Sequence, residues 1–328
     1  MRQLTILIII LFSMSVLQCS NQDTQKEQKE KKKVEFAIAI HGGAGNTSPD
    51  DFPEDERKKY KEKLQEALDK GTELLKSNAS AIETVEQVIH IMEKSPLFNA
   101  GKGAVFTHKG TNELDASIMS GAKLDAGAVA GVKNIKSPIT AAKYVMNNSK
   151  HVLLAGDGAS KFAKKEGLEI VNPSYFYTEK RWKSLQSQLN NDKNGTVGCV
   201  VLDKEGNLAA GTSTGGMTNK KFGRIGDSPI IGAGTYANNE TCAISATGHG
   251  EYFIRYTVAH DISALMEYKN LPLQEAADKV IKDKLMKVKG DGGIIAVDKF
   301  GNVTFSFNTK MMFRGFAKSS GETAIEIF

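Results

Sequence analysis

The stretch that decides the fold begins with Asn194-Gly195-Thr196-Val197-Gly198 and continues through Cys-Val-Val to Leu202. The residues before it, 166–195, are polar and end in a run rich in Asn and Gly, which predicts a mobile, exposed loop. The residues after it are apolar and β-branched, which predicts a buried strand. Thr196 therefore stands where a loop enters the core, directly after a residue without a side chain.

A threonine at such a junction suggests one particular chemistry. A Thr hydroxyl is a weak nucleophile, but a chain cut before the Thr exposes an α-amino group that titrates near pH 8 and can act as its base. Gly195 offers an unobstructed carbonyl to the Thr196 hydroxyl and tolerates a strained backbone. Taken alone, the junction is better explained as an ordinary turn from loop to strand.

The remaining patterns predict helices packed on antiparallel sheet. Two hairpins with Gly-Asn turns are expected, at 196–213 and 293–307, and helical spacing fills 251–268 and 273–288 between them. Helices grouped between hairpins favour an antiparallel sheet over an alternating parallel one. Further strands are expected at 36–40, 114–118, 126–132 and 151–155, and further helices at 58–75, from 81 onward and from 138 onward.

Composition and charge exclude several classes of protein. The 328 residues are 40% hydrophobic and 25% charged, which is typical of a soluble globular chain and excludes collagen, coiled coil and wholesale disorder. About +3 of the net charge of +5 lies near the N-terminus, so the rest gives no case for nucleic acid binding. The three cysteines, Cys19, Cys199 and Cys242, cannot build a disulfide scaffold.

The N-terminal residues resemble an export signal. Arg2 precedes an apolar run at 4–17 that is short for a membrane span, and Cys19 follows at once, so residues 1–19 resemble a lipoprotein signal peptide with Cys19 lipidated. An ordinary secretory signal is the alternative. Residues 20–34 are polar and predict a disordered tether. Both versions imply export, and the first implies a periplasmic protein anchored to the membrane by lipid.

Two other chemistries compete for the glycine-rich segments. Gly211-Thr-Ser213-Thr-Gly215 matches the serine esterase pattern, with Asp227 and His249 or His260 following in the expected order. That pattern needs a helix directly after the serine, and residues 216–223 have no helical period. The glycine loop at 41–45 lacks the spacing of a phosphate-binding loop.

Seven strings, spread over the chain from about residue 38 onward, carry a resemblance to a known family. They are His41-Gly-Gly-Ala-Gly45, Phe98-Asn-Ala-Gly101, Gly195-Thr-Val-Gly198, Thr212-Ser-Thr-Gly-Gly-Met-Thr-Asn219, Gly223-Arg-Ile-Gly-Asp-Ser-Pro229, Gly232-Ala-Gly-Thr-Tyr236 and Thr247-Gly-His-Gly-Glu251. On these strings the chain resembles the isoaspartyl peptidase/L-asparaginase family, the plant-type asparaginases among the N-terminal-nucleophile hydrolases. The resemblance implies an α+β fold, an αββα four-layer sandwich cut by itself into fragments 35–195 and 196–328. It also implies an active dimer of two-fragment protomers, with no required cofactor, that releases L-aspartate from β-aspartyl dipeptides and L-asparagine.

Position by position, the resemblance assigns the site. Thr196 matches the nucleophile, and Thr214 matches the second threonine that positions it. Arg224 matches the clamp on the substrate α-carboxylate, a task that suits its planar fork, and Asp227 matches the partner of the α-ammonium. The Thr247 hydroxyl and the Gly248 N–H correspond to the oxyanion hole, and Gly250 lines the same pocket.

The resemblance also leaves alternatives open. The loop from Met92 to Lys102 is similar to a sodium-binding loop, which would hold a structural ion by backbone atoms. Glycosylasparaginases share the fold but have Asp before the nucleophile and Asn within the Thr-Ser-Thr segment, where this chain has Gly195 and Gly215. A lipid-anchored binding protein that uses the pocket without turnover is a further alternative. The residues of the sodium loop would be Met92, Glu93, Ser95, Phe98, Ala100 and Lys102.

Overall fold

The strand that follows Thr196 lies in the interior of an eight-stranded sheet. In the computed structural model, which describes residues 34–187 and 195–328, β5 (Val197–Leu202) pairs antiparallel with β1 (Ala37–Gly45) and with β6 (Leu208–Thr214). The order is β12-β11-β1-β5-β6-β2-β3-β4, and a second sheet has the order β10-β9-β8-β7. The other strands are β2 (Leu114–Ser120), β3 (Ala126–Val132), β4 (Leu153–Ala155), β7 (Thr235–Ala237), β8 (Cys242–Gly248), β9 (Gly292–Asp298), β10 (Val303–Phe307), β11 (Met311–Lys318) and β12 (Thr323–Glu326).

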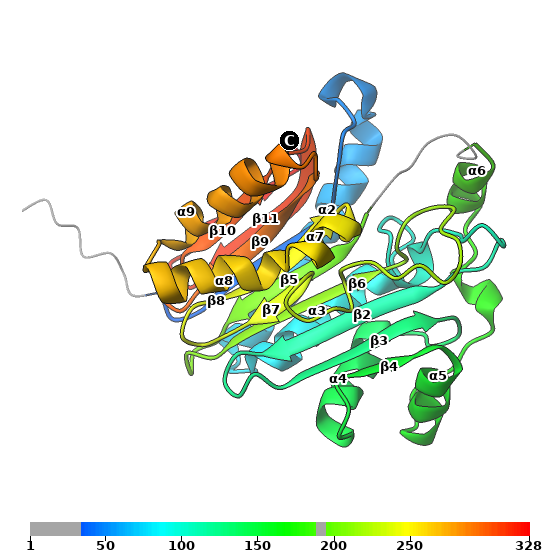
Figure 1. Ribbon diagram of the computed structural model, residues 1–328, viewed down its shortest axis with the longest axis horizontal. Helices are drawn as coiled ribbons and strands as arrows, with labels where there is room; N and C mark the ends of the chain where they lie inside the picture. Colours follow the sequence, from blue (N-terminus) through cyan, green and yellow to red (C-terminus); the bar gives the residue numbers. More distant parts are fainter. Residues whose placement is uncertain (1–33, 188–194) are drawn as a thin grey trace, which may run out of the picture. The chain divides into compact units, whose positions relative to one another are not determined.

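Helices cover the outer faces of the two sheets, which pack against each other (Figure 1). On the larger sheet lie α2 (Glu54–Lys76), α3 (Ala81–Lys94), α4 (Pro138–Asn148) and α5 (Gly156–Lys165). On the smaller sheet lie α8 (Val258–Lys269), α9 (Leu273–Asp278) and the π-helix η4 (Lys279–Leu285). This is the predicted α+β, αββα sandwich. The remaining helical segments are η1 (Pro49–Asp51), η2 (Gly101–Gly103), η3 (Pro173–Phe176), α6 (Glu179–Ser187) and α7 (Gly250–Arg255).

Three separate apolar clusters fill the three spaces between the layers. The alternation along β5 shows how: Cys199 and Val201 face the helices, whereas Val200 and Leu202 face the smaller sheet. Both faces of β5 are therefore buried, which explains its unbroken apolar sequence. Since β1 lies before residue 195 and β5 after it, the two expected fragments would share one sheet.

Helix α3 begins where its sequence predicts. The Ser80 side chain accepts a hydrogen bond from the Glu83 N–H, and the Glu83 carboxylate in turn accepts one from the Ser80 N–H. This capping box fixes the start of the helix that covers β5 and β6.

Several elements differ from the sequence expectations. The stretch 166–187 is not a plain loop, because it contains η3 and α6, and Trp182 of α6 packs edge-on against Phe106. Two strands that the sequence patterns did not predict, β11 and β12, follow the hairpin at 293–307. The helix expected at 251–268 is divided at Thr257, whose φ is 45°. Strand β1 also continues through the glycine loop to Gly45.

The predicted signal peptide, Cys19 and residues 20–33 of the tether lie outside the described residues, as do residues 188–194. Within the described ranges, no helix has both the length and the apolar character needed to cross a membrane.

Candidate active site

The hydroxyl of Thr196 lies beside the carbonyl of the preceding residue. Its Oγ1 is 2.7 Å from the Gly195 carbonyl oxygen and 3.1 Å from Oγ1 of Thr214, at the end of the neighbouring strand β6. Thr214 also donates to the Gly195 carbonyl, at 3.1 Å, and accepts from the N–H of Gly216. The structure thus brings together the three residues that the resemblance places at the cleavage point.

Asn99 completes this group, and the sequence analysis gave it no role. Its Nδ2 donates to the carbonyl oxygens of Gly195 and Gly216, both at 2.7 Å, while its Oδ1 accepts from the Val105 N–H at 2.9 Å. Donors from Asn99, Thr196 and Thr214 therefore converge on one carbonyl oxygen, an arrangement that stabilises negative charge developing there. The available signal was the family-like string at 98–101.

The first strand approaches the junction through a bulge. The pairing of β1 with β11 shifts register between His41 and Gly43, and Gly43 has a φ of 108°. A Cβ on Gly43 would lie 3.2 Å from the Thr196 nitrogen, so a side chain there would crowd the backbone of the predicted nucleophile. This explains the glycine loop at 41–45 as close backbone approach.

His41 is a buried, neutral residue rather than a base. Its Nε2 lies 3.0 Å from Oγ of Ser245, and burial lowers its pKa to about 3. A Cβ on Gly198 would collide with both His41 and Ser245, so glycine is needed where β5 meets β8. Ser245 and Thr247 are two positions apart along β8, so their side chains lie on the same face of the strand. Thr247 is therefore on the face that meets β5.

A row of buried hydroxyls continues from Ser245 between the two sheets. The hydroxyl oxygens of Ser245 and Thr212 are 2.7 Å apart, those of Thr212 and Thr235 are 2.6 Å apart, and those of Thr235 and Ser117 are 2.8 Å apart. The Ser117 hydroxyl also donates to the Ser228 carbonyl, next to Asp227. These side chains are paired with one another although they are cut off from water. The row, called here the hydroxyl chain, consists of Ser245, Thr212, Thr235 and Ser117.

The predicted substrate clamp is formed by the loop before β7 and the start of α7. A Cβ on Gly250 would lie 2.9 Å from Nη2 of Arg224 and 2.8 Å from Oδ1 of Asp227, so the cation and the carboxylate flank one point. Burial raises the pKa of Asp227 to about 7, although the Arg224 charge opposes this. Arg224 itself is held by Glu251, through Nε and Nη2 at 2.9 Å each.

Two predicted substrate contacts carry polar atoms that lack a partner. Oδ2 of Asp227 and Oγ1 of Thr247 are buried and form no hydrogen bond within the described part of the chain. Buried polar atoms are normally paired, and exceptions call for an explanation. A carboxylate oxygen that needs a donor and a hydroxyl free to donate match the expected ammonium partner and oxyanion hole. Gly248, beside Thr247, has a positive φ of 153°, and a Cβ on it would lie 2.6 Å from the Cα of Gly292, so only glycine fits there.

The surroundings of Ser213 do not favour the serine esterase hypothesis. Its Oγ donates to Oε1 of Glu93 at 2.6 Å in the completely buried layer beneath α3. Strand β6 ends at Thr214 and leads into a turn instead of a helix. His260 packs against Tyr236, and His249 lies near Glu251, so neither histidine serves Ser213.

In the predicted sodium loop, from Met92 to Lys102, two glycines pack tightly against backbone carbonyls. A Cβ on Gly101 would collide with the Glu93 carbonyl oxygen, and one on Gly103 with the Phe98 carbonyl oxygen. Glycine is therefore needed at both positions for the loop to fold as it does. The carbonyls of Met92 and Ala100 accept hydrogen bonds from Ser95 and Gly103. Residues 34–187 and 195–328 contain no group of three or more His, Cys, Asp or Glu side chains that could hold a metal.

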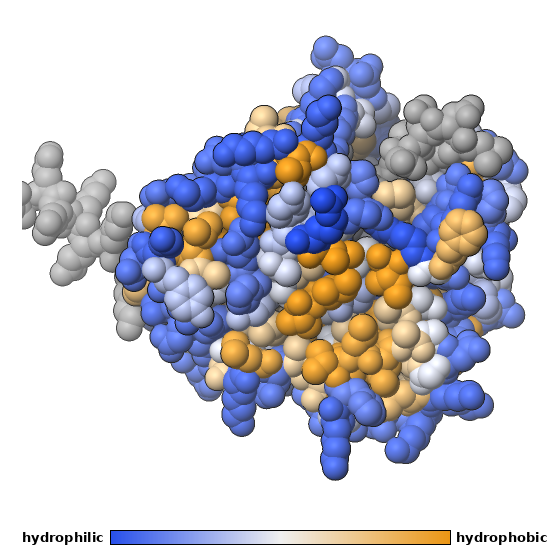
Figure 2. Space-filling model, viewed as in Figure 1, coloured by the Kyte–Doolittle hydropathy of each residue, from blue (hydrophilic) through white to orange (hydrophobic). Residues whose placement is uncertain are grey.

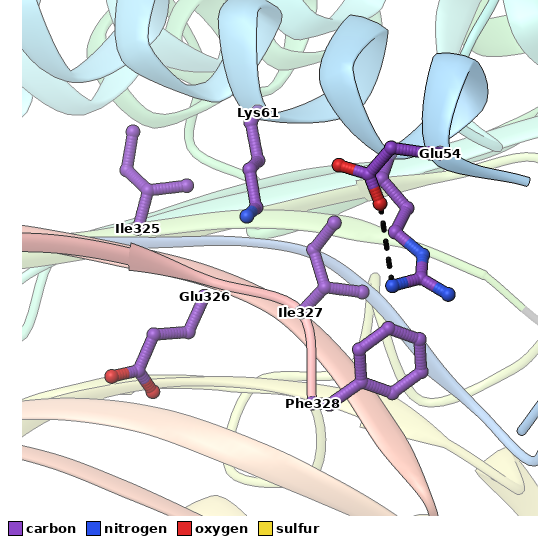
Figure 3. A pocket seen from close by; sticks show the side chains of 7 residues that line it. Glu54, Lys61, Ile325, Glu326, Ile327 and Phe328 are labelled. Atoms are coloured by element: carbon purple, nitrogen blue, oxygen red, sulfur yellow. Dashed lines mark ion pairs between the residues drawn. The ribbon is translucent and has the colours of Figure 1, made fainter. Parts of the chain in front are cut away.

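Several cavities are lined in part by α2, and one of about 90 Å³ contains Asn99 and Gly195. Two larger ones differ in how they relate to the predicted site. One, of about 570 Å³, reaches Gly248 of the predicted oxyanion hole, so we call it the rim cavity. The other, of about 360 Å³, lies beside the C-terminus, where Lys61 points toward β12 and Glu54 pairs with Arg57 (Figure 3). It contains none of the predicted site residues. The rim cavity is lined by apolar and polar residues alike: Ala44, Phe52, Tyr60, Met311 and Phe313 on the one hand, and Asn46, Thr47, Asp51, Glu56, Lys180, Asp291 and Thr309 on the other.

The model of a family described as asparaginase matches residues 34–327. The chain belongs to this asparaginase family. It is 46% identical over 305 residues to an isoaspartyl peptidase of Escherichia coli (strain K12), covering 88% of this chain and 95% of that protein. It is also 46% identical to a probable isoaspartyl peptidase/L-asparaginase 2 of Arabidopsis thaliana, with 89% and 99% covered. A Xenopus laevis isoaspartyl peptidase/L-asparaginase is 40% identical, with 84% and 90% covered. These asparaginase-family matches confirm the resemblance.

Proposed function

We propose that this chain cuts itself between Gly195 and Thr196 and then hydrolyses β-aspartyl bonds, in isoaspartyl dipeptides and in L-asparagine, to release L-aspartate. The names of the relatives support this hydrolase activity. The single observation that carries the proposal is the Thr196 hydroxyl placed against a carbonyl that accepts from Asn99 and Thr214. The charged clamp of Arg224 and Asp227 agrees with it.

Self-cleavage would begin with attack of Thr196 Oγ1 on the Gly195 carbonyl carbon. The new C–O bond forms as the C–N bond breaks and the nitrogen takes up the hydroxyl proton, which gives an ester. Asn99 and Thr214 would stabilise the negative oxygen of the intermediate. Water then hydrolyses the ester, which leaves Gly195 as a carboxylate and Thr196 with a free amine and its hydroxyl.

Turnover would reuse the same hydroxyl on the substrate. The Thr196 amine takes the hydroxyl proton, and Oγ1 attacks the β-carbonyl carbon of the substrate. The unpaired Thr247 hydroxyl and the Gly248 N–H would stabilise the oxyanion. Ammonia or the downstream amino acid leaves with a proton, and water releases L-aspartate from the aspartyl-enzyme.

Arg224 and Asp227 would bind the α-carboxylate and the α-ammonium that both substrates share. The rim cavity reaches Gly248 and has a mixed lining, in which Phe52, Tyr60 and Phe313 lie beside charged side chains. It can receive the second residue of a dipeptide, which asparagine lacks. We therefore expect β-aspartyl-leucine to be a better substrate than L-asparagine. The glycosylasparaginase alternative is not favoured, because Gly195 and Gly215 depart from its pattern and the relatives carry other names.

Three further features belong to the proposal. The loop from Met92 to Lys102 would hold a structural sodium ion by backbone carbonyls, as its resemblance to a sodium-binding loop implies. A dimer of cleaved protomers is supported by Phe222, whose side chain is fully exposed, and by apolar side chains gathered over the part of the larger sheet near β2 and β3 (Figure 2). Export and lipidation at Cys19 rest on the leader sequence alone.

The test compares wild type with Thr196→Ala. The denatured wild-type chains should weigh as two fragments that join at 195/196, whereas the variant should stay whole and release no aspartate from β-aspartyl-leucine or L-asparagine. An intact wild-type chain with full activity would exclude the mechanism. A whole wild-type chain that binds L-aspartate but releases none would favour the binding-protein alternative.

A further inference from the structure

The Arg224 side chain is engaged on one edge only. Glu251, the second residue of α7, accepts from Nε and Nη2 at 2.9 Å each, so its carboxylate pairs side-on with the guanidinium. The hydrogen bond from Arg224 lowers the pKa of Glu251, which keeps the carboxylate ionised. Within residues 34–187 and 195–328, Nη1 forms no hydrogen bond.

A guanidinium can bind two carboxylates, because its five N–H groups form two bidentate edges. With Nε and Nη2 directed at Glu251, the end formed by Nη1 and Nη2 remains. That end rests against two glycines: a Cβ on Gly226 would lie 2.9 Å from Nη1, and one on Gly250 would lie 2.9 Å from Nη2. The same Cβ on Gly250 would lie 2.8 Å from Oδ1 of Asp227. The remaining edge of the guanidinium therefore lies next to Asp227, the predicted partner of the substrate ammonium.

The segment that carries Glu251 also carries the predicted oxyanion donors. Thr247 and Gly248 end β8, and α7 begins at Gly250. The ion pair therefore ties the clamp loop to the oxyanion segment. His249 lies 3.5 Å from Oε2 of Glu251, and Asp291 lies 3.9 Å from the other ring nitrogen, so Glu251 is itself supported at the rim.

We infer that Glu251 is a positioning residue that fixes the Arg224 guanidinium by one edge and presents the other edge to the substrate α-carboxylate. It thereby sets the preference for a free α-carboxylate over its amide. The inference rests on the proposed function, since that function places the α-carboxylate at Arg224. The opposite arrangement, in which Glu251 occupies the clamp and must be displaced, predicts the reverse effect of its removal.

The test measures binding of L-aspartate and of its α-carboxamide, L-isoasparagine, by calorimetry at about pH 8, where Asp227 is ionised. The proteins are wild type, Glu251→Ala and Glu251→Gln, with Glu240→Ala as control. Glu240 is 81% exposed and pairs with Lys299 at 3.6 Å, so its loss removes an ion pair away from the clamp. Chain cleavage and thermal unfolding are followed to show that each variant is folded.

We expect Glu251→Ala to weaken L-aspartate binding and to reduce the preference over L-isoasparagine by about tenfold or more, the worth of one oriented charge-assisted contact. Glu251→Gln keeps one acceptor oxygen, so its affinity for L-aspartate and its preference over L-isoasparagine should lie between those of Glu251→Ala and wild type. Glu240→Ala should match wild type in both quantities. Tighter L-aspartate binding in Glu251→Ala, or an unchanged preference, would overturn the inference. Absence of turnover in a wild type that binds L-aspartate selectively would instead count against the proposed function alone.

Discussion

Around Gly195 the polar atoms are paired within the chain, whereas around Asp227 they are not. The Gly195 carbonyl accepts from Asn99, Thr196 and Thr214, and Asn99 is itself paired at both ends of its amide. Asp227 and Thr247, by contrast, keep buried oxygens without partners in the described chain. The first region is complete because its reactant is the chain itself. The second is incomplete because its reactant arrives from outside.

The largest effect that separates the two regions should come from Asn99→Ala. The variant loses the amide donor to the Gly195 carbonyl, so we expect chain cleavage to slow by about 10²–10³-fold, as for the loss of one oxyanion donor. The measurement is the time course of fragment appearance on a denaturing gel.

The matched control for Asn99→Ala is Asn112→Ala. Asn112 is also buried and donates to the carbonyls of Ala104 and Val105 in the same loop, but it does not reach Gly195. Equal slowing in both variants would mean that the loop fold, and not the donor, controls cleavage.

Arg224→Lys should act on the second region alone. A lysine ammonium cannot match two carboxylate oxygens at once, so we expect kcat/KM for L-asparagine to drop by roughly 100-fold. Chain cleavage should keep its wild-type rate, since no substrate carboxylate takes part in it. Coupled loss of both reactions would show that the two regions are not separable.

A smaller effect is expected for the pH dependence of L-aspartate binding, which should weaken gradually on the acid side. The pKa of Asp227 is raised to about 7 by burial, with Arg224 opposing the rise and Glu251 and Asp115 adding to it. The ammonium of L-aspartate needs the ionised carboxylate, so affinity should fall as the pH drops below about 7, approaching tenfold per unit. Succinate lacks the ammonium and should show no such loss between about pH 8 and pH 6. A parallel decline for both ligands would assign the titration to another group.

The smallest effect on catalysis is expected for Ser213→Ala. Its hydroxyl donates to buried Glu93 on the face of β6 away from the substrate, so turnover should stay close to wild type. The free energy of unfolding should fall by about 1–3 kcal/mol, because a buried acceptor loses its donor. Urea unfolding measures the free energy of unfolding, and an aspartate-release assay measures turnover. A loss of turnover without a loss of stability would instead support the esterase hypothesis.

Much of the fold could be predicted because its signals are local. The two Gly-Asn hairpins, the Ser80 capping box and the apolar run of β5 are each written in a few adjacent residues. Helix α6 was missed because it buries little besides Leu185 and so lacks a period. Strand β11 was missed because Arg314 interrupts its apolar pattern, although it is buried against Glu326 and the Met312 carbonyl.

The site was predictable only in part for the same reason. Motif matching found Thr196, Thr214, Arg224 and Asp227, but it gave no role to Asn99 or Glu251. Asn99 contacts Gly195 across 96 positions of sequence, and Glu251 contacts Arg224 across 27. Such pairs exist only once the sheets and loops are assembled, so no local pattern could reveal them.

The hydroxyl chain between the sheets has a mechanical consequence. Two purely apolar faces could slide past each other at little cost, because dispersion contacts have no direction. The bonds from Ser245 through Thr212 and Thr235 to Ser117 are directional, and each fixes a point of one sheet against the other. They hold β6 and β2 of the larger sheet at a fixed distance from β7 and from β8, the strand that bears Thr247, although none of the four hydroxyls touches the reacting atoms.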